Sequence, residues 1–169
     1  MSGESQEHET GVGRKGLRPG IDHIGVGVGA VIVDSRGQVF LARRGPEARN
    51  ERGRWEFPGG SVHFGETLAG ALCREIREEF GVEIDVMELI NVADHIIEAE
   101  GQHWVSPGFL CRIRSGEPCI LEPDKCSEFR WVPYSVLGGY DLTGASRQTL
   151  QGLTAKYGDR LPGLLPGAG

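Results

Sequence analysis

The chain has 169 residues and a formal net charge of −6 at pH 7, which is enough sequence for one domain with a hydrophobic core. The negative charge argues against general affinity for nucleic-acid polymers or anionic membranes, and no apolar run is long enough to span a bilayer. The N-terminus is too acidic for a secretory signal peptide. Four cysteines without CxxC spacing indicate reduced thiols. We therefore expect a cytoplasmic protein.

Composition separates two tails from a central region. Residues 1–20 are rich in Gly, Glu, Ser, Lys and Arg, whereas residues 158–169 contain Pro162, Pro166 and four glycines. Such segments bury too little apolar surface to offset the entropy lost on ordering. We expect a disordered N-terminal tail over 1–20, a folded domain over 21–157 and a flexible C-terminal tail over 158–169.

The first part of the domain has the pattern of strands joined by turns. Residues 24–33 are rich in β-branched side chains and lead into an Asp-Ser-Arg-Gly turn over 34–37. A second strand is predicted over 38–44, so the pair predicts a hairpin. A charged loop over 45–54 then precedes a short strand over 55–57, which ends at Pro-Gly-Gly.

The run Gly-Val-Gly-Val-Gly over 25–29 has closely spaced glycines, as a dinucleotide-binding fingerprint does, but its context is wrong. That fingerprint requires a glycine turn between a strand and a helix. Here the glycines alternate within a strand that leads to another strand. We interpret them as leaving one strand face bare for another backbone or a ligand.

The main helix is predicted over 67–80. Gly81 is a typical residue just past a helix C-terminus. Apolar residues recur at steps of three and four, as on the buried face of a helix; they are Ala69, Leu72, Cys73, Ile76 and Phe80.

The second part of the domain adds strands over 82–97, 103–113 and 128–133. A short helical turn is predicted over 134–137, and a second helix over 143–157. Strands around two separated helices predict an α/β fold with a mixed β-sheet sandwiched between helices.

Three glutamates of the main helix form an unfavourable charge pattern. Glu75, Glu78 and Glu79 stand at i, i+3 and i+4 on one helix face, where like charges repel by about 0.2–0.5 kcal/mol per pair. They also lie near the helix C-terminus, where the macrodipole disfavours anions. A hard divalent cation would relieve both effects, and Mg²⁺ typically binds one or two carboxylates together with substrate phosphates. A solvated acidic surface is the simpler alternative.

The spacing around these glutamates resembles the signature of a known family. From Gly60 to Val82 the chain follows Gly-x5-Glu-x7-Arg-Glu-Ile-x-Glu-Glu-x-Gly-Val. This pattern matches every specified position of the Nudix box, Gly-x5-Glu-x7-Arg-Glu-U-x-Glu-Glu-x-Gly-U, in which U is a bulky aliphatic residue. The resemblance favours a metal site over a solvated surface, and it implies the Nudix fold.

The resemblance also implies roles for residues of the box. Glu75, Glu78 and Glu79 match the metal-binding glutamates, and the Gly59 carbonyl matches a further metal ligand. Arg74 matches the arginine that orients the catalytic glutamate through an ion pair.

Outside the box, the chain is similar to the MutT branch of the family. Arg43 and Arg44 end a strand, and after the charged loop the chain continues Trp-Glu-Phe-Pro-Gly-Gly over 55–60. The resemblance implies that Arg43, Arg44, Glu56 and Gly60 contact substrate. Solvated arginines at a strand end remain an equal alternative.

A later glutamate completes the expected site. Glu122 follows Gly116-Glu117-Pro118 as in a MutT-type pattern whose later acid is a further metal ligand or a general base, although Glu128 is a rival. The general base stays open between Glu75 and Glu122. The histidines, including His95, show no metal-ligand spacing.

The activity implied by the resemblance is a Mg²⁺-dependent pyrophosphohydrolase, with Mn²⁺ as a candidate substitute and metal-activated water as the nucleophile. MutT-like features favour a nucleoside triphosphate, including oxidised purine nucleotides, cleaved to the monophosphate and pyrophosphate. The alternatives are hydrolysis of ADP-ribose, a nucleotide sugar or another diphosphate, and a silent nucleotide-binding regulatory module. Family analogy also allows a homodimer.

Overall fold

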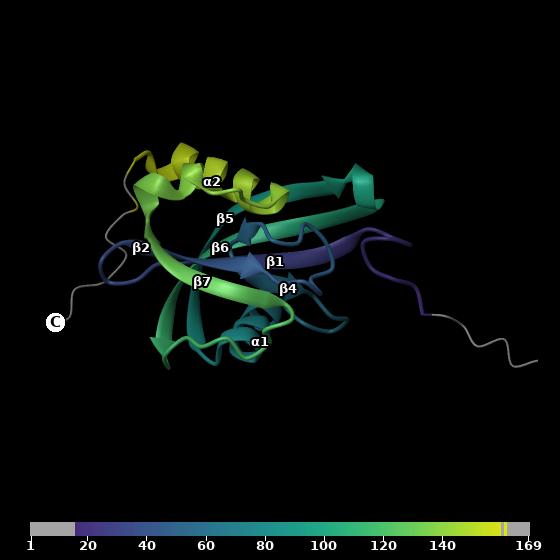
Figure 1. The fold of residues 1–169 in the computed structure, drawn as a ribbon, viewed down its shortest axis with the longest axis horizontal. Coiled ribbons are helices and arrows are strands. Elements are labelled where there is room, and N and C mark those ends of the chain that lie inside the picture. Colours follow the sequence, from purple (N-terminus) through teal and green to yellow (C-terminus); the bar gives the residue numbers. More distant parts are fainter. Residues whose placement is uncertain (1–15, 160, 162–169) are drawn as a thin grey trace, which may run out of the picture.

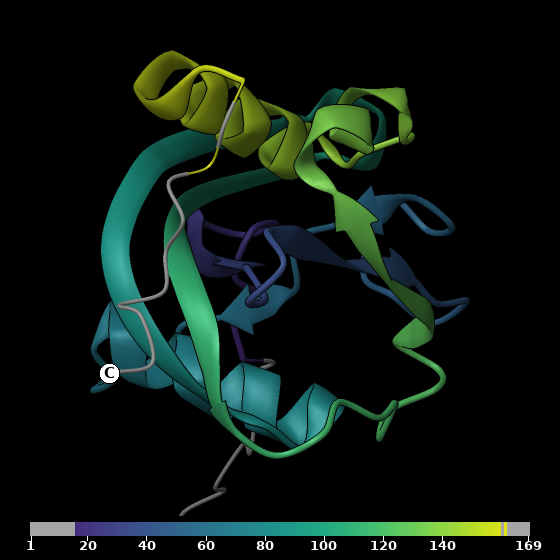
Figure 2. The same ribbon diagram turned by 90° about the vertical axis from the view of Figure 1, so that its left-hand side faces the viewer.

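The computed structural model describes residues 16–159 and 161, and the parts of the expected tails over 1–15, 160 and 162–169 lie outside the described residues. The described chain forms two sheets and two α-helices. Figures 1 and 2 show how these elements are arranged in space. In chain order the strands are β1 (Gly25–Ile32), β2 (Gln38–Arg44), β3 (Trp55–Glu56), β4 (Gly59–Ser61), β5 (Glu83–Ile97), β6 (Gln102–Ser115) and β7 (Cys126–Pro133). The helices are α1 (Leu68–Phe80) and α2 (Gly144–Tyr157), with short 3₁₀ helices η1 (Glu98–Glu100) and η2 (Tyr134–Gly139).

The strands divide into a mixed sheet and an antiparallel sheet. The mixed sheet has the order β4-β1-β6-β5, with β1 and β6 parallel. The antiparallel sheet has the order β3-β2-β7. The predicted α/β class with mixed strand pairing is confirmed, but the strands form two sheets where we expected one.

The predicted hairpin between the first two strands is wrong. β1 pairs with β4 along one edge and with β6 along the other, so neither edge is free for β2. β2 instead pairs with β3 and β7, and the two expected hairpin strands meet only at an isolated bridge between Val33 and Val39. The local turn signal was correct, but the strand partners depend on segments far along the chain.

Helix α1 begins and ends where its sequence predicts. The Thr67 side chain accepts a hydrogen bond from the Gly70 N–H at 3.0 Å, and Gly81 takes a left-handed conformation with φ 71°. The buried face differs by one position from the expected one, because Ala69 is exposed and Ala71 is buried. That shift brings the carboxylate of Glu75 onto the inner side of the helix.

The two helices lie on opposite sides of the strands (Figure 2). Helix α1 packs against β1, β4 and β5, where Leu72, Ile76 and Phe80 are fully buried beside Phe40. Helix α2 packs mainly on β5 and buries Leu153 in a second cluster. No helix in the described part of the chain is long and apolar enough to cross a membrane.

Candidate active site

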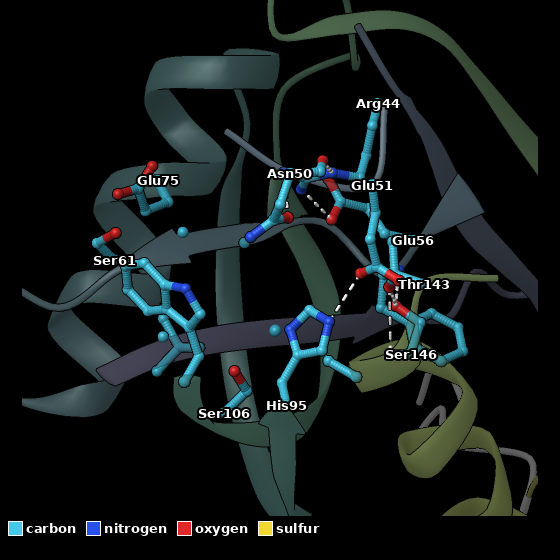
Figure 3. Close-up of a pocket in the computed structure, with 18 of the residues that line it drawn as sticks. Arg44, Asn50, Glu51, Glu56, Ser61, Glu75, His95, Ser106, Thr143 and Ser146 are labelled. Atoms are coloured by element: carbon cyan, nitrogen blue, oxygen red, sulfur yellow. Dashed lines mark hydrogen bonds and ion pairs between the residues drawn. The ribbon is translucent and has the colours of Figure 1, made fainter. Parts of the chain in front are cut away.

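A cavity of about 230 Å³ lies between the sheets and the two helices. One part of its wall comes from β3, β4 and α1, and another from β5, β6 and the start of α2. The β2–β3 loop, residues 45–54, adds a third part. Gly27 and Gly29 of β1 also line the cavity, and because they have no side chains they leave the strand's backbone accessible there. The charged and polar side chains lining it include Arg44, Arg49, Asn50, Glu51, Glu56, Ser61, Glu75, Glu79, His95, Ser106 and Lys125; Figure 3 shows most of them.

The two inner glutamates of α1 face this cavity. Glu75 is only 9% exposed, and Glu79 is half-buried beside the charges of Glu56, Glu75 and Glu122. Glu78 is exposed, and its carboxylate turns to Arg74 at 3.1 Å. The structure thus places Glu75, Glu79 and Glu56 on one cavity, whereas Glu78 lies outside its lining.

Burial, reinforced by the neighbouring carboxylates of Glu56, Glu75 and Glu122, raises the pKa of Glu79 from 4.5 to about 8. Without a cation, this carboxyl therefore holds its proton at neutral pH. A bound divalent cation would favour the ionised form and displace that proton.

Because folding raises this pKa, the metal-free protein should lose stability as pH rises. Below about 4.5 Glu79 is protonated in both the folded and unfolded states, and between about 4.5 and 8 only the folded state keeps the proton. This contribution to the free energy of unfolding is therefore lost through that window and levels off above it. We expect Tm in EDTA to decrease from pH 5 to 8.5 more steeply for the wild type than for Glu79→Gln. Parallel curves for the two proteins would contradict the assignment.

Arg74 binds three glutamates of the box. Its guanidinium donates to both oxygens of Glu66 at 2.6 and 3.0 Å, to Glu75 at 2.9 Å and to Glu78 at 3.1 Å. It also donates to the Ser61 carbonyl of β4 at 3.0 Å. The hydrogen bond from Arg74 is the main cause that lowers the pKa of Glu66 to about 2. Arg74 therefore joins α1 to β4 and orients the Glu75 carboxylate.

Gly59 and Gly60 are packed so closely that neither has room for a side chain. A Cβ on Gly59 would overlap the backbone of Val28 in β1, and a Cβ on Gly60 would overlap the Glu75 carboxyl group. The first obstacle is fixed backbone, whereas the second is the movable end of a side chain.

These two obstacles predict different effects for two similar substitutions. Gly59→Ala should lower the free energy of unfolding by at least about 2 kcal/mol, because β4 must separate from β1. Gly60→Ala should keep most stability but displace Glu75 and reduce turnover by at least about tenfold. Thermal unfolding and initial rates of both variants test this contrast. Equal stability losses would contradict it.

The two adjacent arginines of β2 have different surroundings. Arg44 is largely buried and donates to Glu56 at 2.6 Å and to the Asn50 carbonyl and side-chain oxygen at 2.7 and 2.9 Å. Arg43 is exposed, donates to the Gly53 carbonyl, and does not line the cavity. Arg44 and Glu56 therefore join the β2–β3 loop to the cavity wall.

Glu122 and its neighbours follow β6 at the C-terminal end of α1. The segment is held by hydrogen bonds from the Cys119 and Leu121 N–H groups to the last carbonyls of α1. Glu122 is half-buried and pairs with Lys125, whose charge lies close to Glu79 and lines the cavity. Glu128 instead pairs with Arg130 and Arg43.

Several residues of the site were not found from the sequence. Arg49, Asn50, Glu51, His95 and Lys125 line the cavity, yet none stands in a recognisable motif. The density of charge in the β2–β3 loop was the only local signal, and a solvated loop gives the same signal.

The donor atoms around the acids suit a hard divalent cation. Among the described residues, no three His, Cys, Asp or Glu side chains are already grouped as metal ligands. Mg²⁺, however, usually takes one or two carboxylates and completes its shell with water and substrate phosphates. Two inward carboxylates, Glu75 and Glu79, together with the backbone of Gly59 and Gly60 on the same cavity, meet that requirement.

The family of the chain follows from comparison with known proteins. The NUDIX domain matches residues 23–152, which include both sheets and most of α2. The chain belongs to the Nudix family, in which a divalent metal is typical, and it is a MutT-like hydrolase of phosphoanhydride bonds. The family expected from the box is thereby confirmed.

The chain resembles one solved structure in sequence and fold, and two further relatives in sequence. The crystal structure of a MutT NUDIX hydrolase from Burkholderia pseudomallei is 40% identical, with a TM-score of 0.70 over 77% of this chain and 98% of that chain. The CTP pyrophosphohydrolase of Escherichia coli (strain K12) is 33% identical over 115 residues, 63% of this chain and 83% of the relative. The 8-oxo-dGTP diphosphatase of Proteus vulgaris is 40% identical over 73 residues, 43% of this chain and 62% of that enzyme, so the match spans less than two thirds of its length.

Proposed function

We propose that this Nudix hydrolase is a Mg²⁺-dependent nucleoside triphosphate pyrophosphohydrolase, which releases the monophosphate and pyrophosphate. The observation that carries the proposal is a single cavity with two chemically different parts. Glu56, Glu75 and Glu79 gather where α1 meets the strands, and the polar and aromatic side chains of His95 and Trp104 line the rest. Such a cavity suits a substrate with a polyphosphate at one end and a base at the other.

The acids would hold the metal. Glu75, Glu78 and Glu79 supply carboxylates, with the Gly59 carbonyl and Glu122 as further oxygen ligands, and Glu78 must first turn away from Arg74. The bound ion would neutralise phosphate oxygens and lower the pKa of a bound water. Mn²⁺, which accepts similar ligands, would be a substitute.

The remaining groups would orient and deprotonate the attacking water. Glu75 or Glu122 takes the proton. Arg74 is a positioning residue for Glu75, because its 2.9 Å hydrogen bond directs that carboxylate to the cavity. The pair between Glu122 and Lys125 would have to open before Glu122 could act as a base.

Substrate phosphates would meet backbone and cations along the cavity. Gly60 lets phosphate approach the backbone of β4. Arg44 would act mainly through its contacts with Glu56 and Asn50, since these already occupy its guanidinium. Arg43 would need to swing from the Gly53 carbonyl to reach substrate. Arg49 and Lys125, which line the cavity, are further candidates for phosphate contacts.

A nucleoside triphosphate is favoured as substrate because two relatives are named as a CTP pyrophosphohydrolase and an 8-oxo-dGTP diphosphatase. Oxidised purine nucleotides therefore belong in the substrate panel beside the canonical ones. ADP-ribose, nucleotide sugars and dinucleoside polyphosphates represent the other diphosphates of the family's chemistry.

Phosphorus NMR of the purified protein with Mg²⁺ and this panel tests the proposal. Formation of a monophosphate and pyrophosphate from a triphosphate, absent with Glu79→Gln protein prepared in parallel, is the expected result. Cleavage of ADP-ribose or a nucleotide sugar alone would keep the hydrolase and replace the substrate. Ligand binding without any cleavage would point to a regulatory module.

A further inference from the structure

His95 of β5 presents a ring nitrogen to the cavity. The residue is 9% exposed, lines the cavity, and its Nε2 lies 2.7 Å from Glu51 Oε2. Figure 3 shows the imidazole with Nε2 directed at Glu51 and the other nitrogen on the far side of the ring, toward the open centre of the cavity. No hydrogen bond to that second nitrogen, Nδ1, comes from the described residues.

Glu51 determines which nitrogen of this ring carries the proton. Its carboxylate accepts hydrogen bonds from the Gly144 N–H and from Arg54, both at 3.0 Å, and faces His95. Burial opposes ionisation, but the hydrogen bonds from His95 and Gly144, together with nearby positive charge such as that of Arg54, lower the pKa of Glu51 below its ordinary value. An ionised carboxylate can only accept. Whenever the imidazole is neutral, its single proton therefore sits on Nε2, and Nδ1 keeps a lone pair.

The position of Glu51 is held from several elements of the fold. Its backbone has φ 43°, the left-handed region that non-glycine residues rarely adopt. Its N–H donates to Glu100 at 3.2 Å, and the neighbouring Asn50 donates to Gln102 of β6 at 2.9 Å. A strained residue retained by this many contacts indicates a geometry that is needed at the cavity.

We propose that His95 reads the nucleobase, with Nδ1 accepting a hydrogen bond from an amino group of the base and Glu51 acting as the positioning residue. This inference rests on the proposed hydrolysis of nucleoside triphosphates. A buried acceptor that meets a donor is satisfied, whereas one that meets a carbonyl oxygen is left unpaired and repelled. The site should therefore prefer an amino-bearing base to its oxo counterpart, by roughly tenfold or more in kcat/KM.

The variant Glu51→Gln should reverse this polarity without removing a side chain. The Gly144 N–H and Arg54 can only donate, so the amide oxygen of the glutamine must remain facing them. Its NH₂ group then faces His95 and donates to Nε2. The imidazole proton moves to Nδ1, and the atom that faces the cavity changes from an acceptor to a donor.

The test compares kcat/KM for pairs of triphosphates that differ in an amino or oxo group, CTP with UTP and ATP with ITP. Wild type should favour the amino member of at least one pair, and Glu51→Gln should shift that ratio at least tenfold toward the oxo member. His95→Phe, which keeps a flat ring but no nitrogen, should bring the ratio close to one. Glu47→Gln is the matched control, because it makes the same chemical change at an exposed residue of the same loop that does not line the cavity, and its ratio should equal that of wild type.

Nitrogen-15 NMR of the His95 ring gives a readout independent of turnover. We expect the Nε2–H tautomer in wild type and the Nδ1–H tautomer in Glu51→Gln. Two results would overturn the inference even if the wild type cleaves triphosphates. One is the same tautomer in both proteins, and the other is an amino-to-oxo ratio of kcat/KM that stays unchanged in Glu51→Gln and His95→Phe. If wild type cleaves no triphosphate at all, the proposed function fails and this inference fails with it.

Discussion

Replacing Glu79 by glutamine should reduce turnover by at least about a hundredfold while leaving the protein folded. The substitution keeps the shape of the side chain but removes the cavity-facing negative charge that would bind the metal. In metal-free protein the same change should raise Tm at pH 8 by at least about 3 °C, because a neutral amide does not resist burial as a carboxylate does. A residue needed for the reaction would thus be unfavourable for the stability of the metal-free fold.

Two measurements separate these effects. Initial rates with Mg²⁺ give the loss of turnover, and thermal unfolding in EDTA gives the stability. Glu98→Gln in η1 is the matched control, because Glu98 is exposed and outside the cavity lining, and both quantities should stay at the wild-type values. A near-normal rate for Glu79→Gln would remove Glu79 from the proposed metal site.

Replacing Arg74 by alanine should damage stability and turnover together. The variant leaves Glu66, Glu75 and Glu78 without their shared cation and the Ser61 carbonyl without its donor. Arg74, Glu66 and Glu78 are only partly buried, so we expect the free energy of unfolding to fall by about 2 kcal/mol, below the loss for a fully buried ion pair. Turnover should fall roughly tenfold to a hundredfold, because the Glu75 carboxylate loses its orienting contact.

Arg74→Lys distinguishes geometry from charge. A lysine keeps the positive charge, but its single ammonium cannot reproduce the planar fork that reaches both oxygens of Glu66 and the neighbouring groups. It should recover part of the stability and less of the turnover. Arg114→Ala, at an exposed arginine with weak surface ion pairs, should change the free energy of unfolding by less than about 1 kcal/mol. If Arg74→Ala had the same free energy of unfolding and the same turnover as Arg114→Ala, the positioning role of Arg74 would be wrong.

The sequence alone determined the elements whose signals are local. Helix α1 begins after the Thr67 cap and ends at Gly81 because capping groups and a left-handed glycine act within one turn. The fixed spacing of the box predicted the family for the same reason, since the acids and Arg74 lie on consecutive turns of one helix. The alternating glycines of β1 also indicated a strand, which the structure confirms.

Only the tertiary structure decided which strands pair and which side chains reach the cavity. The hairpin prediction failed because β4 and β6, which both come after β2 in the chain, occupy the two edges of β1. The contact between Glu51 and His95 joins residues 44 positions apart, and the bond from Gly144 to Glu51 spans 93 positions. Hydrogen bonds over such separations depend on how the helices, strands and loops pack against one another. The spacing of residues within one segment does not specify that packing. The acidic motif could therefore be predicted from the sequence, whereas the part of the cavity wall that would contact a substrate's base could not.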